Sequence, residues 1–193
     1  MEPKEIIRQS FHMIIGIVVL LLLYFDFIGS EWLLIIFIAG LAVSLLLRGS
    51  KHSAIVKFIE KYERPIHRKL PGKGPIFFFL GAWLVVRFFP KDIALAAIAI
   101  LAFGDALSTM ISLSNGRTKH PLCKNKLLEG SLAGTAVGFL VAMIFVVWWQ
   151  ALIAAFIAMI IEAIEIKIYA FQIDDNLSVP VIAAAVIFLL QMI

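Results

Sequence analysis

Long apolar runs separated by short polar breaks dominate the chain. The runs cover residues 11–28, 32–47, 76–89, 93–113, 132–149, 151–161 and 179–193. They are continuous and lack the alternation that a lipid-facing β-strand requires. Because a helix needs about 20 residues to cross a bilayer, this pattern predicts an all-α, polytopic membrane helical bundle of about seven transmembrane helices.

The composition strengthens this interpretation. The chain has 193 residues, of which 62% are hydrophobic and 16% charged, and a soluble domain of this size would expose too much apolar surface. The length allows one integral membrane domain over residues 1–193, without a separate soluble domain. The single cysteine, Cys123, rules out a disulfide framework, and nothing in the chain suggests nucleic acid as a partner.

The charge pattern predicts an orientation. Residues 48–73 contain eight Lys or Arg against two acids, so we expect a basic cytoplasmic segment over 48–74 with a surface helix at 53–63. A cytoplasmic N-terminus would also place residues 115–126 and 162–178 on the inner side. The sequence therefore predicts a multi-pass protein whose basic loops face the cytoplasm.

A polar face on the fourth run is the first candidate site. Asp105, Ser108, Thr109 and Ser112 follow helical spacing, which places one carboxylate and three hydroxyls on one side. The preceding residue, Gly104, allows a ligand or backbone to approach closely. A carboxylate in a span needs a function or a partner, so Asp105 is either a Mg²⁺ ligand or a structural acid paired with Lys or Arg.

A basic loop follows this face. A polyphosphate bound between its cations and a metal would explain the loop as a whole, although membrane topology alone also favours such charges. The loop residues with cationic or titratable side chains are Arg117, Lys119, His120, Lys124 and Lys126.

The fifth run begins with Glu129, Gly130 and Ser131. The amides at the start of a helix form an anion site, so we expect a phosphate site along residues 104–131. Glycine repeats every four residues from Gly130 to Gly138, a spacing typical of close helix packing within the chain or in a homodimer.

An acidic linker is expected over residues 162–178. It contains Glu162, Glu165, Asp174, Asp175 and Asn176. Solvated positions are the default for Glu165 and Asp174. Asp175 and Asn176, which precede a helix expected to begin at Pro180, could supply a second metal ligand or orient a hydroxyl nucleophile.

Taken together, these pieces resemble the family of dolichol kinases, phytol kinases and CTP-dependent diacylglycerol kinases. The resemblance extends over almost the whole chain, in the family's order. It departs from the family pattern at Leu127, where Ser or Thr is usual, and at Ser112, where a second small residue is usual. The matching pieces are Arg8 with His12 and Gly16, residues 74–81, residues 104–106, Lys126 with residues 129–131, and Glu162 followed by residues 175–180.

The resemblance implies phosphoryl transfer from CTP to a membrane lipid alcohol, with Mg²⁺ and the active site facing the cytoplasm. Asp105 and Glu129 would hold Mg²⁺, Lys126 and Arg117 would bind phosphates, and Asp175 would act on the lipid hydroxyl. Further nucleotide contacts are expected from Gly104, Ser108, Lys119, Gly130, Ser131 and Asn176.

A polyprenol or dolichol is the first acceptor expected, then geranylgeraniol or phytol, then diacylglycerol. The membrane would be the plasma membrane in a prokaryote and the endoplasmic reticulum otherwise. Two other functions stay open at this point. One is a cytidylyltransferase that makes CDP-lipids, and the other is a small transporter or scaffold that binds an ion.

Overall fold

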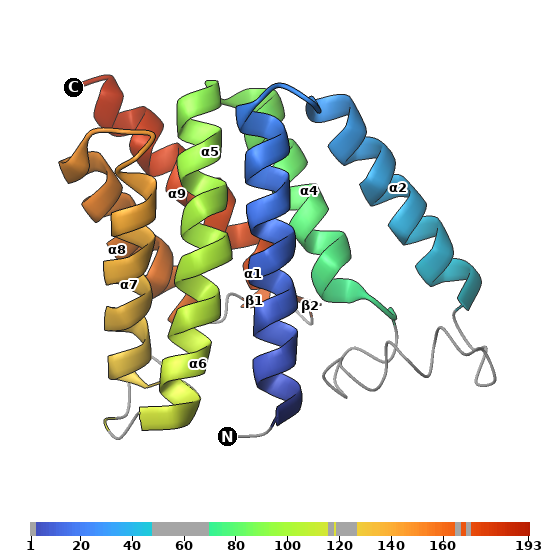
Figure 1. The fold of residues 1–193 in the computed structure, drawn as a ribbon, viewed down its shortest axis with the longest axis horizontal. Helices are drawn as coiled ribbons and strands as arrows, with labels where there is room; N and C mark the ends of the chain where they lie inside the picture. The colour runs from blue at the N-terminus through green and yellow to red at the C-terminus, as the bar shows by residue number, and fades with distance from the viewer. Residues whose placement is uncertain (1–2, 48–69, 116–117, 119–126, 165–166, 169–170) are drawn as a thin grey trace.

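The computed structural model describes residues 3–47, 70–115, 118, 127–164, 167–168 and 171–193. These residues form a bundle of roughly parallel and antiparallel helices (Figure 1). The elements in chain order are α1 (Pro3–Tyr24), α2 (Ser30–Leu47), α4 (Lys73–Phe88), α5 (Lys91–Ala99), the π-helix η2 (Ile100–Asp105), α6 (Ala106–Asn115), α7 (Leu128–Ala142), α8 (Trp148–Ile164), β1 (Lys167–Ile168), β2 (Phe171–Gln172) and α9 (Asp175–Gln191).

The centre of the bundle is one continuous rod made of α5, η2 and α6. All residues from Ile93 to Ala99 are buried, and four of those seven are alanine, so neighbouring helices can approach closely on every side. The rod contacts α1, α7 and α9. It therefore positions the residues at its middle, around Asp105, among several helices at once.

The helix α2 lies at the edge of the bundle. It packs mainly against α4, and most of its large apolar side chains are exposed, including Trp32 at 56% and Leu46 at 82%. In Figure 1 it leans away from α1 at its far end. Such an apolar, exposed surface is expected of a helix that faces lipid.

Three helical stretches are long and apolar enough to cross a bilayer. They are Lys4–Tyr24, Ser30–Leu47 and Lys91–Ser114, and shorter apolar helices cover Leu128–Ala142, Trp148–Ile164 and Asp175–Gln191. The helical class is thus confirmed for the described residues, and the length and composition of these helices are consistent with the predicted membrane bundle. The count of seven spans and the cytoplasmic N-terminus remain predictions.

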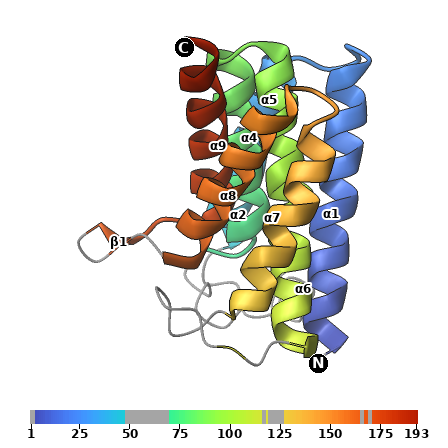
Figure 2. The same cartoon turned by 90° about the vertical axis from the view of Figure 1, so that its left-hand side faces the viewer.

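The acidic linker is shorter than expected. Helix α8 continues to Ile164 and α9 already begins at Asp175, five residues before Pro180. The connection contains a two-residue antiparallel pair, β1 with β2, which projects from the side of the bundle (Figure 2). The surface helix expected at residues 53–63 lies outside the described residues.

Candidate metal centre

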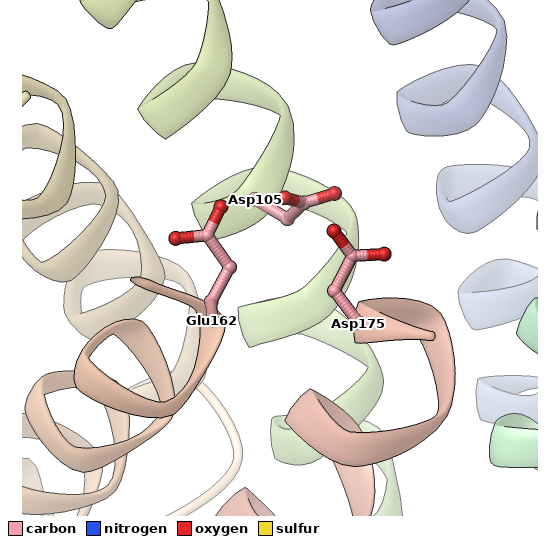
Figure 3. Close-up of side chains that lie close together, drawn as sticks. All are labelled: Asp105, Glu162 and Asp175. Carbon is pink, nitrogen blue, oxygen red and sulfur yellow. The ribbon is translucent and has the colours of Figure 1, made fainter. Parts of the chain in front are cut away.

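Three carboxylates from three separate helices meet in the bundle. They belong to Asp105, Glu162 and Asp175, and one ligand oxygen from each lies within 4.8 Å of the other two. Figure 3 shows the three side chains pointing toward one another. Asp105 is 6% exposed and Glu162 is 3% exposed. Among the described residues, this site is therefore formed by side chains from three different helices inside the bundle, and it is not a surface patch.

Each carboxylate is placed by the end of a helical segment. Asp105 is the last residue of η2, where a π-turn widens the helix, a feature that often accompanies functional sites. Glu162 lies in the last turn of α8 and Asp175 is the first residue of α9. The short connection between α8 and α9 therefore brings Glu162 and Asp175 back to the same level of the central rod.

The donor set fits a hard divalent cation. Carboxylate oxygens are the preferred protein ligands of Mg²⁺, Mn²⁺ and Ca²⁺. Three negative charges within 4.8 Å also repel one another where water is scarce. A bound divalent cation would offset this repulsion, so the residues present are chemically suited to hold one.

A buried ion pair supports the start of α9 beside the cluster. Nζ of Lys73 lies 3.3 Å from Oδ2 of Asp174, and their side chains are 14% and 6% exposed. Oδ1 of Asp174 accepts a hydrogen bond from the amide N–H of Asn176 and so caps the helix. Asp174 was expected to be solvated, and its burial corrects that expectation.

Burial also changes the protonation of this cap. The pKa of Asp174 is raised to about 6, chiefly because burial penalises the carboxylate and then because Asp175 lies next to it. The hydrogen bonds from Asn176 and the charge of Lys73 act in the opposite direction. Lys73 therefore helps Asp174 to remain an ionised cap.

Glycines bring α7 against the polar face of α6. A Cβ added at Gly134 would lie 2.7 Å from the carbonyl oxygen of Gly104 and 2.8 Å from Cβ of Ser108. A Cβ at Gly130 would overlap Oγ of Ser112 and the carbonyl oxygen of Ser108. The predicted close packing is therefore confirmed at Gly130 and Gly134, whereas a Cβ at Gly138 would make only ordinary contacts. The homodimer stays a prediction.

Another glycine brings α4 against the start of α9. A Cβ at Gly81 would lie 2.5 Å from the carbonyl oxygen of Asn176 and 3.0 Å from Cγ of Pro180. Pro180 has no N–H to bond the carbonyl of Asn176, its partner in a regular helix. The contact with Gly81 therefore covers backbone that the proline leaves without its helical bond.

Apart from Glu129, the predicted site residues that the structure describes lie in three places. Asp105 and Asp175 meet in the cluster, Gly104, Ser108, Gly130 and Ser131 lie at or near the contact between α6 and α7, and Asn176 is in the first turn of α9. Arg117, Lys119 and Lys126 lie outside the described residues.

Glu129, the second predicted metal ligand, is not one of the three clustered acids. Its carboxylate accepts hydrogen bonds from the amide N–H of Thr118, at 2.9 and 3.3 Å. Glu162 takes the third place in the cluster, a metal role that the sequence analysis did not assign to it. The available signal was its place in the family pattern, ahead of residues 175–180.

Comparisons with known proteins agree with the resemblance seen in the motifs. The chain is 28% identical to the CTP-dependent diacylglycerol kinase 1 of Schizosaccharomyces pombe, over 61% of this chain and 60% of the relative. It is 29% identical to a probable chloroplast phytol kinase of Triticum aestivum, over 61% of this chain and 44% of the relative.

A third relative covers nearly the whole chain. It is the chloroplast farnesol kinase of Arabidopsis thaliana, 26% identical over 97% of this chain and 66% of the relative. The predicted resemblance to the CTP-dependent lipid-alcohol kinase family is therefore confirmed, at modest identity. The chain spans about half the length of several of these relatives. No protein-family model and no solved structure matches it.

Proposed function

We propose that this protein is a CTP-dependent kinase that phosphorylates the hydroxyl group of a membrane lipid alcohol. The observation that carries the proposal is the cluster of Asp105, Glu162 and Asp175, whose ligand oxygens lie within 4.8 Å of one another. The names of the relatives, which are kinases of diacylglycerol, phytol and farnesol, support the same reaction class.

The acceptor that we propose is an isoprenoid alcohol. Phytol and farnesol kinases are among the relatives, and a polyprenol or dolichol is a longer alcohol of the same kind. Diacylglycerol is the second candidate, favoured by the fission yeast relative. In each case the chemistry at the reacting end is the same, because each lipid presents a single hydroxyl group near the membrane surface.

The reaction needs charge neutralisation and positioning more than covalent chemistry. A Mg²⁺ ion held by the three acids would neutralise charge on the phosphates of CTP. Asp105, Glu162 and Asp175 fix the place where the γ-phosphate meets the acceptor. The hydroxyl oxygen bonds to the γ-phosphorus, the bond from that phosphorus to the β–γ bridging oxygen breaks, and CDP leaves while the hydroxyl proton passes to a carboxylate.

The nucleotide would approach along α6 and α7. Ser108 and Ser131 are buried at this contact, 1% and 7% exposed, and the loop with Arg117, Lys119 and Lys126 connects the same two helices. Those three cations are proposed to bind the phosphates, with the active site on the cytoplasmic side. Glu129 is proposed to position this loop through the amide of Thr118, rather than to bind the metal.

The two enzyme functions differ in which phosphate of CTP reaches the lipid. Purified protein is incubated with Mg²⁺, a mixture of lipid alcohols and CTP labelled at either the γ or the α phosphate. A kinase transfers label to lipid from the γ position alone. Label from the α position would instead establish a cytidylyltransferase, and label from neither would contradict both enzyme functions.

Two substitutions on the same rod sharpen this test. Asp105→Asn removes a charge from the cluster while it keeps the side-chain shape, and transfer should fall at least 100-fold. Asp92→Asn is the matched control, because Asp92 is an exposed acid in the first turn of α5, and transfer should stay within twofold. Equal losses in both variants would argue against the cluster as the active site.

A further inference from the structure

His12 lies beside the carboxylate cluster and has no role in the function proposed above. Its side chain is 15% exposed, and its Nε2 atom lies 4.0 Å from Oδ2 of Asp105. Within the described part of the chain, this buried nitrogen has no hydrogen-bond partner. Buried polar atoms in folded proteins are nearly always hydrogen-bonded, so this atom is suited to a partner that arrives with a ligand.

Packing holds the His12 ring in this place. The edge of the ring contacts Phe78, with ring centroids 5.4 Å apart and planes at 86°, and Phe78 itself is 1% exposed. One turn further along α1, a Cβ added at Gly16 would overlap Cβ of Ala102. This close contact between α1 and the central rod holds the backbone of His12 beside Asp105.

The separation of the two atoms suits one bridging oxygen. An oxygen about 2.8 Å from each would form two normal hydrogen bonds, with an angle of about 90° between them across the 4.0 Å gap. A carboxylate can only accept hydrogen bonds. The bridging group must therefore donate its proton to Asp105 and accept a hydrogen bond from the Nε2–H of His12.

A hydroxyl group meets this requirement, whereas a phosphate oxygen has no proton to donate and would face the carboxylate. Helix α1 also carries an exposed apolar face, on which Phe11 and Ile14 are each 53% exposed and Val18 is 49% exposed. A lipid that lies along this helix would have its polar end close to His12.

We propose that the hydroxyl group of the acceptor lipid binds between His12 and Asp105. This inference rests on the proposed function for the class of ligand, and it identifies His12 as a residue that touches and orients the substrate. The hydroxyl donates to Oδ2 of Asp105 and accepts from Nε2–H of His12, which leaves one lone pair of the oxygen free to face the phosphorus.

Binding of an alcohol and of its methyl ether tests this directly. The full chain in detergent micelles, without CTP or divalent cation, is titrated with farnesol and with farnesyl methyl ether, which has the same chain but no proton to donate. The same pair is made from dioctanoylglycerol, so that either acceptor class gives a result. The wild type should bind at least one alcohol about tenfold more tightly than its ether.

Substitutions of His12 then test whether this residue causes the preference for the alcohol over its ether. In His12→Leu the preference should fall below about twofold, whereas His12→Gln should keep most of it, because the glutamine amide can place an N–H near the Nε2 position. The control Gln9→Leu removes another buried polar group from α1 and should leave the preference unchanged. If His12→Leu does not fold, His12→Asn replaces it, because its shorter amide cannot reach.

Two results would overturn the inference. One is a wild type that binds alcohol and ether equally, as expected if water fills the position, and the other is a His12→Leu variant that keeps the tenfold preference. A failure of the proposed function can be distinguished from a failure of this inference. Protein that prefers the alcohol through His12 but transfers no label from CTP would overturn the kinase and leave this hydroxyl site in place.

Discussion

The clustered acids differ in whether the dipole of their own helix stabilises or destabilises a negative charge. Asp175 is the first residue of α9, where the helix dipole favours a carboxylate, whereas Glu162 lies in the last turn of α8, where the dipole opposes one. Glu162 is also the most buried of the three, at 3% exposed. Its charge should therefore depend most on a bound cation.

Glu162→Gln should raise the Mg²⁺ concentration needed for half-maximal activity by at least tenfold. The variant keeps the size of the side chain but removes one of three negative ligands. The measurement is phosphoryl transfer as a function of Mg²⁺ concentration. Glu31→Gln, in the exposed first turn of α2, should leave the Mg²⁺ dependence unchanged, and an unchanged curve for Glu162→Gln would exclude it as a ligand.

Lys73→Met should lower the free energy of unfolding by roughly 3 kcal/mol, because it leaves Asp174 as a buried carboxylate without this partner. Lys91→Met is a useful contrast. Lys91 pairs with Asp26 at 2.6 Å, but their side chains are 49% and 79% exposed, so its loss should cost less than about 1 kcal/mol. Unfolding in mixed micelles measures both, and equal costs would refute the role given to burial.

For single residues, the sequence predicted only some members of the site. Asp105 and Asp175 could be proposed because glycine, serine or asparagine next to an acid near a span suggests a ligand site. Glu162 and Glu165 are three residues apart just after the sixth apolar run, and local sequence alone could not predict that Glu162 lies among the clustered acids. The burial of Asp174 depends on Lys73, a distant residue in the chain.

At the scale of helices, small residues decide how closely the elements meet. Gly134 and Gly138 belong to the same repeat in α7 but have different surroundings. A Cβ at Gly138 would lie 3.6 Å from Cβ of Ala155, an ordinary contact, whereas one at Gly134 would lie 2.7 Å from both the Gly104 oxygen and the Met159 sulfur. The glycine spacing alone could not distinguish them.

Gly134→Ala should therefore destabilise the protein by about 1–3 kcal/mol, since backbone must move to accommodate the methyl group. Gly138→Ala should be neutral or slightly stabilising, because alanine favours the helix. Thermal unfolding of the two variants in the same detergent checks the difference. If Gly134→Ala unfolds no earlier than Gly138→Ala, α6 and α7 are not packed as closely as described.

Gly16→Ala should separate α1 from the central rod near Ala102 and so move His12 away from Asp105. We expect a loss of lipid-alcohol phosphorylation of at least tenfold, with the chain still folded. Gly40→Ala in α2 is the control, because its added Cβ would lie an ordinary 3.6 Å from Ile76. Full activity in Gly16→Ala would show that this contact does not position the site.

The apolar pattern predicted the helices well, with boundaries that differ from the structure by a few residues at most ends. It could not predict the π-helix at Ile100–Asp105, since a widened turn has no distinct periodicity in so apolar a run. It also placed the start of the last helix at Pro180, whereas Asp174 caps that helix earlier. Capping by Asp174 overrode the usual placement of proline near the start of a helix.

At the scale of the whole molecule, the site lies where α8 ends and α9 begins, partway along the central rod. Helices α1 and α6 continue past that level (Figure 1, Figure 2). The turn between α1 and α2 and the start of α5 lie together at the opposite end, joined by Lys91 and Asp26. The proposed cytoplasmic site and this turn should therefore face opposite sides of the membrane.

Cysteine labelling tests that orientation. Cys123, the single cysteine of the chain, should react with a membrane-impermeant maleimide in inverted vesicles only. In a Cys123→Ala background, Phe27→Cys, at a residue 72% exposed near the α1–α2 turn, should react in right-side-out vesicles only. The reverse pattern would place the N-terminus and the proposed nucleotide loop on the outer side.

The central claim is that Asp105, Glu162 and Asp175 form one divalent-cation site. Its most direct test is a titration with Mn²⁺, followed by electron paramagnetic resonance, of the purified wild type and of the variants Asp105→Asn, Glu162→Gln and Asp175→Asn. The account predicts one tightly bound Mn²⁺ per wild-type chain, weakened at least tenfold in each variant but not in Asp92→Asn. Wild-type binding that all three variants keep unchanged would contradict it.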